Sequence, residues 1–225
     1  MLHFLHTLPV VSLQQHAFIW FIPIIIAATA TAAVAILIAN SESTPSSGVE
    51  GESIGVLGMP GAGKTQFLNN LRGKDYPEYT QTINETPYKS FKVKVNGREK
   101  TIKEGEDIPG NEYAVREYYE RFLKEKDIVI FLFDAKKYKE DNKYQDASNA
   151  RLDFINRHKK GDKSHFIIGT HVDQIKIRKG ESLLTIMQEL IKGKDYEGLF
   201  HHNFSVRNLT ESKDFEELKE IIFQK

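Results

Sequence analysis

The chain has 225 residues, enough for one globular domain of ordinary size and an additional N-terminal segment. Its 31 basic and 31 acidic side chains balance, so the composition does not indicate a basic nucleic-acid-binding domain. The sequence contains no cysteine, which excludes disulfides, thiolate zinc sites and a cysteine nucleophile.

The N-terminal part of the chain has the composition of a membrane anchor. Residues 18–39 are almost wholly apolar, and no Asp, Glu, Lys or Arg occurs before residue 42. A helix of this length crosses a hydrocarbon layer of about 30 Å. We therefore expect a short tail at 1–17, a transmembrane helix at 18–39, a flexible linker at 40–51 and a folded domain at 52–225. The alternatives are a cleaved signal peptide, which the run's length and the missing basic flank disfavour, and a buried core helix.

A glycine-rich motif of the form G-x-x-x-x-G-K-[ST] occupies residues 58–65. The apolar residues at 54–57 predict a buried strand before it, and residues 65–71 predict a helix after it. In such a loop, backbone N–H groups and the helix N-terminus surround phosphates, Lys64 contacts the β- and γ-phosphates, and Thr65 binds Mg²⁺. We therefore expect the chain to bind a nucleoside triphosphate. The predicted phosphate-site residues are Gly58, Gly61, Ala62, Gly63, Lys64, Thr65 and Gln66.

The rest of the domain shows the alternation of an α/β protein. Residues 91–95 and the following Asn96-Gly97 predict a hairpin whose second strand occupies 98–107. The uninterrupted apolar run at 127–134 predicts a central strand of a mostly parallel sheet covered on both faces. The expected fold is therefore a doubly wound α/β P-loop domain. The other predicted elements are helices at 113–126, 142–158, 181–191 and 214–223, a buried strand at 165–169 and an edge strand at 199–204.

Polar motifs follow the predicted strands, at the edge where α/β sheets bind ligands. They are Asp107-Ile108-Pro109-Gly110, Thr170-His171-Val172-Asp173 and Ser205-Val206-Arg207. In this order after a P-loop, they resemble the D-x-x-G, [NT]-K-x-D and S-A-K motifs of the Ras/Arf superfamily of small GTPases. The N-terminal anchor, the helix directly after Asn111-Glu112 and the strand end Asp134-Ala135 make the chain most similar to the signal recognition particle receptor β subunits.

The resemblance implies roles for these motifs. Asp107 would hold Mg²⁺ through water, and the Gly110 N–H would bind the γ-phosphate. Asp173 would accept from the N1–H and the exocyclic amine of guanine, and adenine lacks that pair of donors. The predicted base-site residues are Thr170, His171, Asp173, Ser205 and Val206.

The segment at 79–85 resembles switch I. This resemblance makes Thr82 the candidate for the threonine that joins Mg²⁺ and the γ-phosphate, with Thr80 and Thr86 as alternatives. The predicted metal ligands are therefore Thr65, Thr82 and Asp107. The predicted catalytic residues are Lys64, Thr82, Gly110 and Asn111.

Three residues depart from the Ras-like pattern. Pro60 occupies a loop position that is usually Gly or Ala there. His171 replaces the lysine that lies over the guanine ring; its imidazole offers a similar stacking surface, and the alternative is an exposed loop histidine. Asn111 replaces the glutamine that orients the attacking water, with a side chain one methylene shorter. We therefore predict slow hydrolysis that needs a partner.

The sequence thus predicts a GTP-binding protein with one membrane anchor that slowly hydrolyses GTP with Mg²⁺. Through its switch regions it would recruit a protein partner to the membrane, with no nucleic-acid partner. Its domain would lie in the cytoplasm, at the endoplasmic reticulum in a eukaryote or the inner membrane in a bacterium. One alternative is a nucleotide-stabilised docking subunit with negligible turnover. The other is an anchored ATPase or kinase that uses Asp134 as its Walker-B carboxylate.

Overall fold

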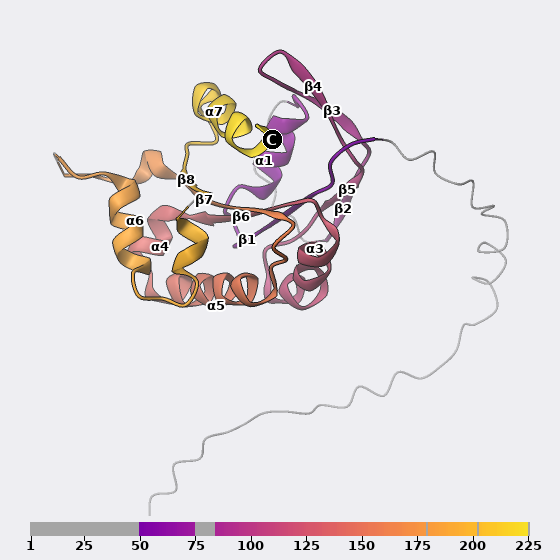
Figure 1. The fold of residues 1–225 in the computed structure, drawn as a ribbon. Helices are drawn as coiled ribbons and strands as arrows, with labels where there is room; N and C mark the ends of the chain where they lie inside the picture. The colour runs from indigo at the N-terminus through magenta and orange to yellow at the C-terminus, as the bar shows by residue number, and fades with distance from the viewer. Residues whose placement is uncertain (1–49, 75–83, 179, 202, 225) are drawn as a thin grey trace, which may run out of the picture. The chain divides into compact units, whose positions relative to one another are not determined.

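The computed structural model describes residues 50–74, 84–178, 180–201 and 203–224 (Figure 1). The predicted tail at 1–17, the predicted transmembrane helix at 18–39 and most of the predicted linker lie outside the described residues. Within the described ranges, no helix combines the length and the apolar character needed to cross a membrane.

Four parallel strands form the central sheet, in the order β1-β6-β7-β8. Every residue of β6 is buried, as expected for a central strand with helices on both faces. The register places Gly58 beside Leu132 and Asp134 beside Thr170, so the loops after β1, β6 and β7 leave the same edge of the sheet. The strands are β1 (Ile54–Gly58), β6 (Ile128–Asp134), β7 (Ser164–Thr170) and β8 (Phe204–Val206).

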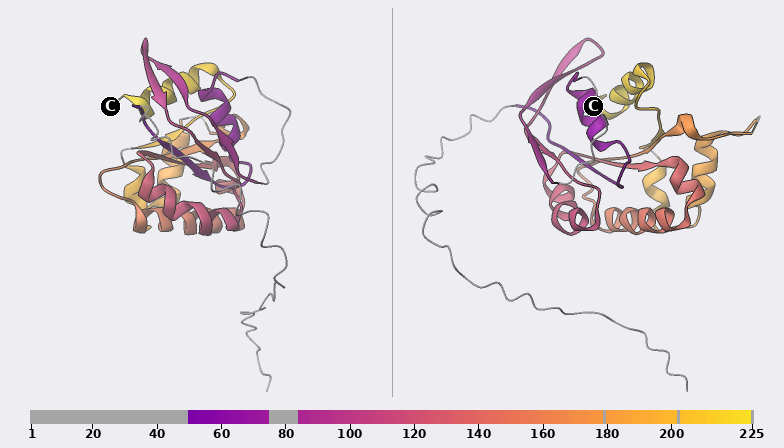
Figure 2. Two further views of the ribbon diagram at one scale, coloured as in Figure 1. Left: turned by 90° about the vertical axis from the view of Figure 1, so that its right-hand side faces the viewer. Right: turned by 180° about the vertical axis from the view of Figure 1, so that it is seen from behind.

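Helices cover both faces of this sheet, so the described domain is a doubly wound α/β fold (Figures 1 and 2). On one face, α1 (Lys64–Leu71) packs on α7 (Ser212–Phe223) through an edge-to-face contact of Phe67 with Phe215 at 5.7 Å. The opposite face carries α3 (Glu120–Glu125) and α5 (Asn142–His158). The remaining helical segments are α2 (Glu112–Ala114), α4 (Ala135–Glu140), α6 (Leu183–Ile191), the 3₁₀ turns η2 (Val172–Gln174) and η3 (Glu197–Phe200), and the π-helical turn η1 (Val115–Tyr119).

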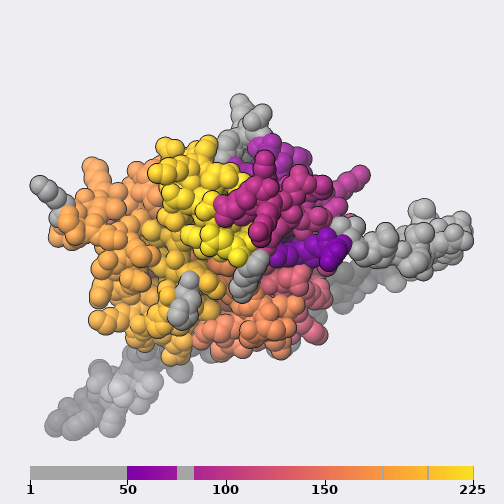
Figure 3. Space-filling view, turned by 45° about the horizontal axis from the view of Figure 1, so that its top comes forward, coloured from indigo at the N-terminus to yellow at the C-terminus, as the bar shows by residue number. Residues whose placement is uncertain are grey.

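Two antiparallel pairs extend the domain beyond β1. The predicted hairpin at Asn96-Gly97 is confirmed, and it lies beside α7 (Figure 3). Its second strand was predicted at 98–107 but is shorter. The Lys103 N–H donates to the Glu52 carbonyl oxygen at 2.9 Å, so the chain leaves the hairpin at this residue. The residues beyond form a separate strand. The pairs are β3 (Phe91–Val95) with β4 (Arg98–Ile102), and β2 (Thr86–Tyr88) with β5 (Gly105–Asp107).

The predicted edge strand at 199–204 is present at the edge of the sheet, but its predicted bounds are wrong. Its first residues belong to the turn η3, where the Leu199 N–H donates to the Tyr196 carbonyl oxygen at 2.9 Å. Leu199 and Phe200 are buried there, and the Phe200 ring lies 4.6 Å from that of Phe204. These apolar residues therefore fill the core from a turn, and the pairing strand starts only at Phe204.

Candidate nucleotide site

The phosphate loop joins the buried strand β1 to helix α1. Gly63 forms the N-cap of α1 in the left-handed conformation, with φ 84°, which glycine adopts without strain. Among the described residues, no side chain caps this helix end, and the N–H groups of its first turn have no partners inside the helix. Such a helix terminus is suited to bind an anion.

Lys64 lies at the start of α1 and folds back over the phosphate loop. Its Nζ donates to the Met59 carbonyl oxygen at 3.1 Å, and only 6% of the residue is exposed. Burial lowers the pKa of Lys64 to about 8, with Asp107 raising it and Arg151 lowering it further. The amine is therefore charged at neutral pH and becomes neutral in mildly alkaline solution.

This pKa gives a pH dependence for nucleotide binding. The charged amine attracts phosphate and the neutral amine does not, so we expect GTP affinity to fall as the pH rises above about 8. The steepest expected fall is about tenfold per pH unit, since one proton is taken up on binding. Calorimetric titrations on both sides of this pKa at constant ionic strength would measure it. An affinity that does not change across this range would contradict the prediction.

Thr65 and Asp107 form the predicted magnesium site. The Thr65 hydroxyl donates to Asp107 Oδ2 at 2.6 Å, and Asp107 is buried at the end of β5. Hydroxyl and carboxylate oxygens fit Mg²⁺, which is usually held by few protein ligands together with water and substrate phosphates. Thr82 and Thr80 lie outside the described residues, whereas Thr86 is exposed in β2 beside Asp107.

Asp134, the alternative Walker-B carboxylate, has a different role in the structure. Its Oδ1 accepts from the Lys137 N–H at 3.0 Å and so caps helix α4. Asp107, and not Asp134, is bonded to the loop hydroxyl of Thr65. This arrangement favours Asp107, the acidic residue of the GTPase prediction, over Asp134, the acidic residue of the ATPase or kinase alternative.

Gly110 lies against the phosphate loop. A Cβ atom added there would lie 2.6 Å from both Lys64 Nζ and the Pro60 nitrogen, so a larger residue would displace the loop. The next residue, Asn111, accepts from the Ala114 N–H through Oδ1 at 3.0 Å and caps α2. In this structure the Asn111 side chain is bonded to the helix. Its predicted function in orienting water stays a prediction.

Two side chains after β7 connect the base-site loop to the phosphate loop. The Thr170 hydroxyl lies 3.1 Å from the carbonyl oxygens of both Ala62 and Phe133. His171 Nε2 lies 3.0 Å from the Gly61 carbonyl oxygen and Nδ1 lies 3.3 Å from Gln174 Nε2. These partners select the tautomer with the proton on Nε2, since a carbonyl only accepts. His171 is therefore in contact with the phosphate loop, and its predicted stacking on the guanine ring stays a prediction.

The remaining predicted base-site residues follow β7 or pair with its end. Asp173 is exposed in the turn η2. Ser205 and Val206 belong to β8 itself, whereas the sequence placed them after a strand. The Arg207 N–H donates to the Gly169 carbonyl oxygen at 2.8 Å, which fixes this segment beside the end of β7.

Comparison with known proteins identifies the family. Residues 53–168 match the family described as 50S ribosome-binding GTPase, and this range is slightly more than half of the chain. The chain belongs to this GTPase family. No curated protein matches it. The prediction of a P-loop GTPase domain is thus confirmed, and the matched range includes the phosphate loop and Asp107-Ile108-Pro109-Gly110 but ends before Thr170.

Sequence analysis missed one hydroxyl in the GTPase site. The Gly58 N–H, at the start of the phosphate loop, donates to the Tyr119 hydroxyl at 3.2 Å. Burial raises the pKa of Tyr119 to about 12, so this hydroxyl is neutral at physiological pH. The neighbouring Tyr118 hydroxyl donates to the Glu85 carboxylate. Both tyrosines belong to the π-helical turn η1. Such a turn has an extra residue, and no sequence pattern indicated it.

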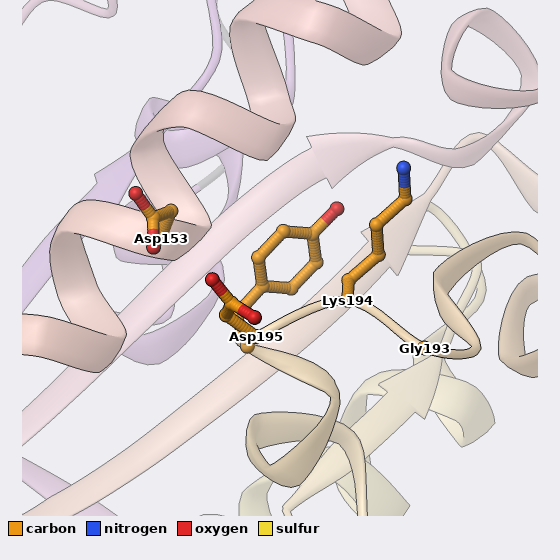
Figure 4. Close-up of a pocket in the computed structure, with 5 residues that line it drawn as sticks. Asp153, Gly193, Lys194 and Asp195 are labelled. Atoms are coloured by element: carbon orange, nitrogen blue, oxygen red, sulfur yellow. The ribbon is translucent and has the colours of Figure 1, made fainter.

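A separate hollow of about 200 Å³ lies between α5 and the turn after α6 (Figure 4). Asp153 lines it from α5, and Lys194 and Asp195 line it from the turn. Asp153 is already paired with Arg157, and Lys194 extends away from both carboxylates. Of the predicted nucleotide-site residues that the structure describes, none lines this hollow.

Proposed function

We propose that the chain is a membrane-anchored guanine-nucleotide switch that resembles the signal recognition particle receptor β subunits. The main support for nucleotide binding is a pair of contacts with the phosphate loop. Thr170 contacts the Ala62 carbonyl oxygen, and His171 contacts the Gly61 carbonyl oxygen. These contacts hold the base-site loop against the phosphate loop, so a single nucleotide can contact both. Membrane attachment rests on the apolar run at 18–39.

The proposed reaction is attack of water on the γ-phosphate of GTP. Lys64 and the N–H groups at the start of α1 would stabilise the phosphate charge, and Gly110 would sense the γ-phosphate from its position against the loop. Thr65 and Asp107 would hold Mg²⁺, which when bound neutralises charge on the phosphates. Loss of the γ-phosphate would release Gly110 and the segment near Thr82, and this change would alter partner binding.

The test is a titration with GTP and ATP followed by single-turnover hydrolysis. We expect a clear preference for GTP and turnover at or below about 10⁻³ s⁻¹ without a partner, because Asn111 caps a helix and is shorter than glutamine. Tighter binding of ATP would support the ATPase or kinase alternative. No hydrolysis at all would support the alternative of a docking subunit. Turnover above about 10⁻¹ s⁻¹ would contradict the prediction that the protein needs a partner to complete its catalytic residues.

The proposed anchor gives a separate prediction. We expect the full-length protein to stay with membranes during carbonate extraction, because a helix over 18–39 would be long enough to cross the bilayer. A chain that starts at Glu52 should be released and should still bind GTP. A released full-length protein, or a mature N-terminus near Asn40, would instead support a processed signal peptide. In a membrane, the GTPase domain would face the cytoplasm, where GTP is available.

A further inference from the structure

Arg151 is a buried cation in contact with the phosphate loop. It lies on the inward face of α5 and is 6% exposed. Its guanidinium contacts the sulfur of Met59, the loop residue after Gly58. Within the described residues, no carboxylate forms an ion pair with it. Because burial of an unpaired charge is unfavourable, this position favours an anion supplied from outside the chain.

Met59 connects this cation to a second one. The Met59 carbonyl oxygen accepts from Lys64 Nζ at 3.1 Å, while its side chain contacts Arg151. Arg151 is near enough to contribute to the lowered pKa of Lys64, after the larger effect of burial. The carboxylate that acts in the opposite direction is Asp107, which is bonded to Thr65. Two positive charges therefore act on one short loop.

The hydroxyl groups around Arg151 do not neutralise it. Tyr119 and Tyr144 are close enough for the Arg151 charge to oppose the rise of their pKa values that burial causes. Both remain neutral phenols near pH 7, so they offer dipoles but no negative charge. Within the protein interior, a charge acts over longer distances than in water, because the effective dielectric constant is lower.

We infer that Arg151 is a positioning residue that supports the phosphate loop through Met59 and adds a second positive charge near the β- and γ-phosphates. This inference rests on the proposed guanine-nucleotide binding and deepens it. The nucleotide supplies the anion that compensates Arg151 and Lys64 together. The contribution of Arg151 therefore increases with the number of phosphates, from GMP to GDP to GTP.

The test compares three variants of the full-length protein. Arg151→Met removes the charge and keeps the length, Arg151→Lys keeps a charge, and Arg157→Met is a control on the exposed face of the same helix, where Arg157 pairs with Asp153. Calorimetric titrations with GMP, GDP and GTP measure affinity, and thermal unfolding without nucleotide measures the stability of the fold.

We expect Arg151→Met to bind GTP at least tenfold more weakly, GDP less affected and GMP unchanged. Its nucleotide-free unfolding temperature should equal or exceed that of the wild type, because an unpaired buried charge is lost. Arg151→Lys should keep the wild-type ratio of GTP to GMP affinity, and Arg157→Met should match the wild type throughout.

An equal loss of affinity for all three nucleotides, together with a lower unfolding temperature, would show that Arg151 only supports the fold and would overturn the inference. Wild-type GTP affinity in Arg151→Met would also overturn it. If Arg151→Met does not fold, Arg151→Lys provides the test. A ratio of GTP to GMP affinity below that of the wild type in this variant would show that the positive charge does not cause the preference for GTP, and it would overturn the inference. Failure of the wild type and Arg157→Met to bind any guanine nucleotide would instead refute the proposed function.

Discussion

Replacement of Lys64 by alanine is expected to weaken GTP binding by about 100-fold or more. A hydrogen bond to a charged group contributes about 1.5–3 kcal/mol, and Lys64 would contact two phosphate groups. Because about 1.4 kcal/mol corresponds to tenfold in affinity, loss of both contacts gives this magnitude. The N–H groups of α1 would remain, but they carry only partial charges. A calorimetric titration with GTP and Mg²⁺ measures the effect.

The matched control for this prediction is Lys143→Ala, which removes an exposed lysine from α5. It should bind GTP as the wild type does. Lys64→Ala should also keep its nucleotide-free unfolding temperature, since Lys64 donates there only to loop carbonyl oxygens and its buried charge is unfavourable. Unchanged GTP affinity in Lys64→Ala would mean that residues 58–65 do not bind phosphate.

The elements that were predicted correctly are those whose pattern is local. The run at 127–134 can be buried only in the middle of a covered sheet, and the helix at 142–158 has the bounds that its sequence predicted. Asn96-Gly97 determined its hairpin because both residues adopt positive φ, 49° and 76°.

The elements that were wrong depend on distant residues. The strand at 98–107 divides because Glu52, far away in sequence, binds the backbone of Lys103. Leu199 and Phe200 have the composition of a strand, yet both are buried in a turn, and the Phe200 ring packs against Phe204. Local propensity is a weak guide where tertiary packing decides.

The site shows the same division. The structure brings Asp107, Gly110, Thr170 and His171 against the phosphate loop, since residues at strand ends converge on one edge of the sheet, and the roles predicted for them stay predictions. The sequence did not indicate that Tyr119 would accept from the Gly58 N–H, because that contact depends on the π-helical turn to which Tyr119 belongs. It also did not single out Arg151, since one arginine among the polar residues of a long helix resembles a surface residue until its burial is known.

Replacement of Asp173 by asparagine is expected to change base preference from guanine toward xanthine. In the proposed complex, the carboxylate accepts from the N1–H and the exocyclic amine of guanine, and an amide offers a donor where the second acceptor was. Xanthine carries an oxygen in place of that amine, so it can accept from the asparagine. Loss of two hydrogen bonds to a charged group predicts a fall in GTP affinity of about 100-fold, with a gain for XTP.

Competition titrations of GTP against XTP measure this change, and Asp146→Asn is the control. Asp146 is exposed on α5, so its loss should leave the selectivity as in the wild type. Asp173 is also exposed, in the turn η2, so its replacement should not affect folding. A variant that keeps wild-type selectivity for GTP over XTP would show that Asp173 does not read the base. The contacts of Thr170 and His171 with the phosphate loop would then stabilise the loop without bringing the carboxylate to the guanine.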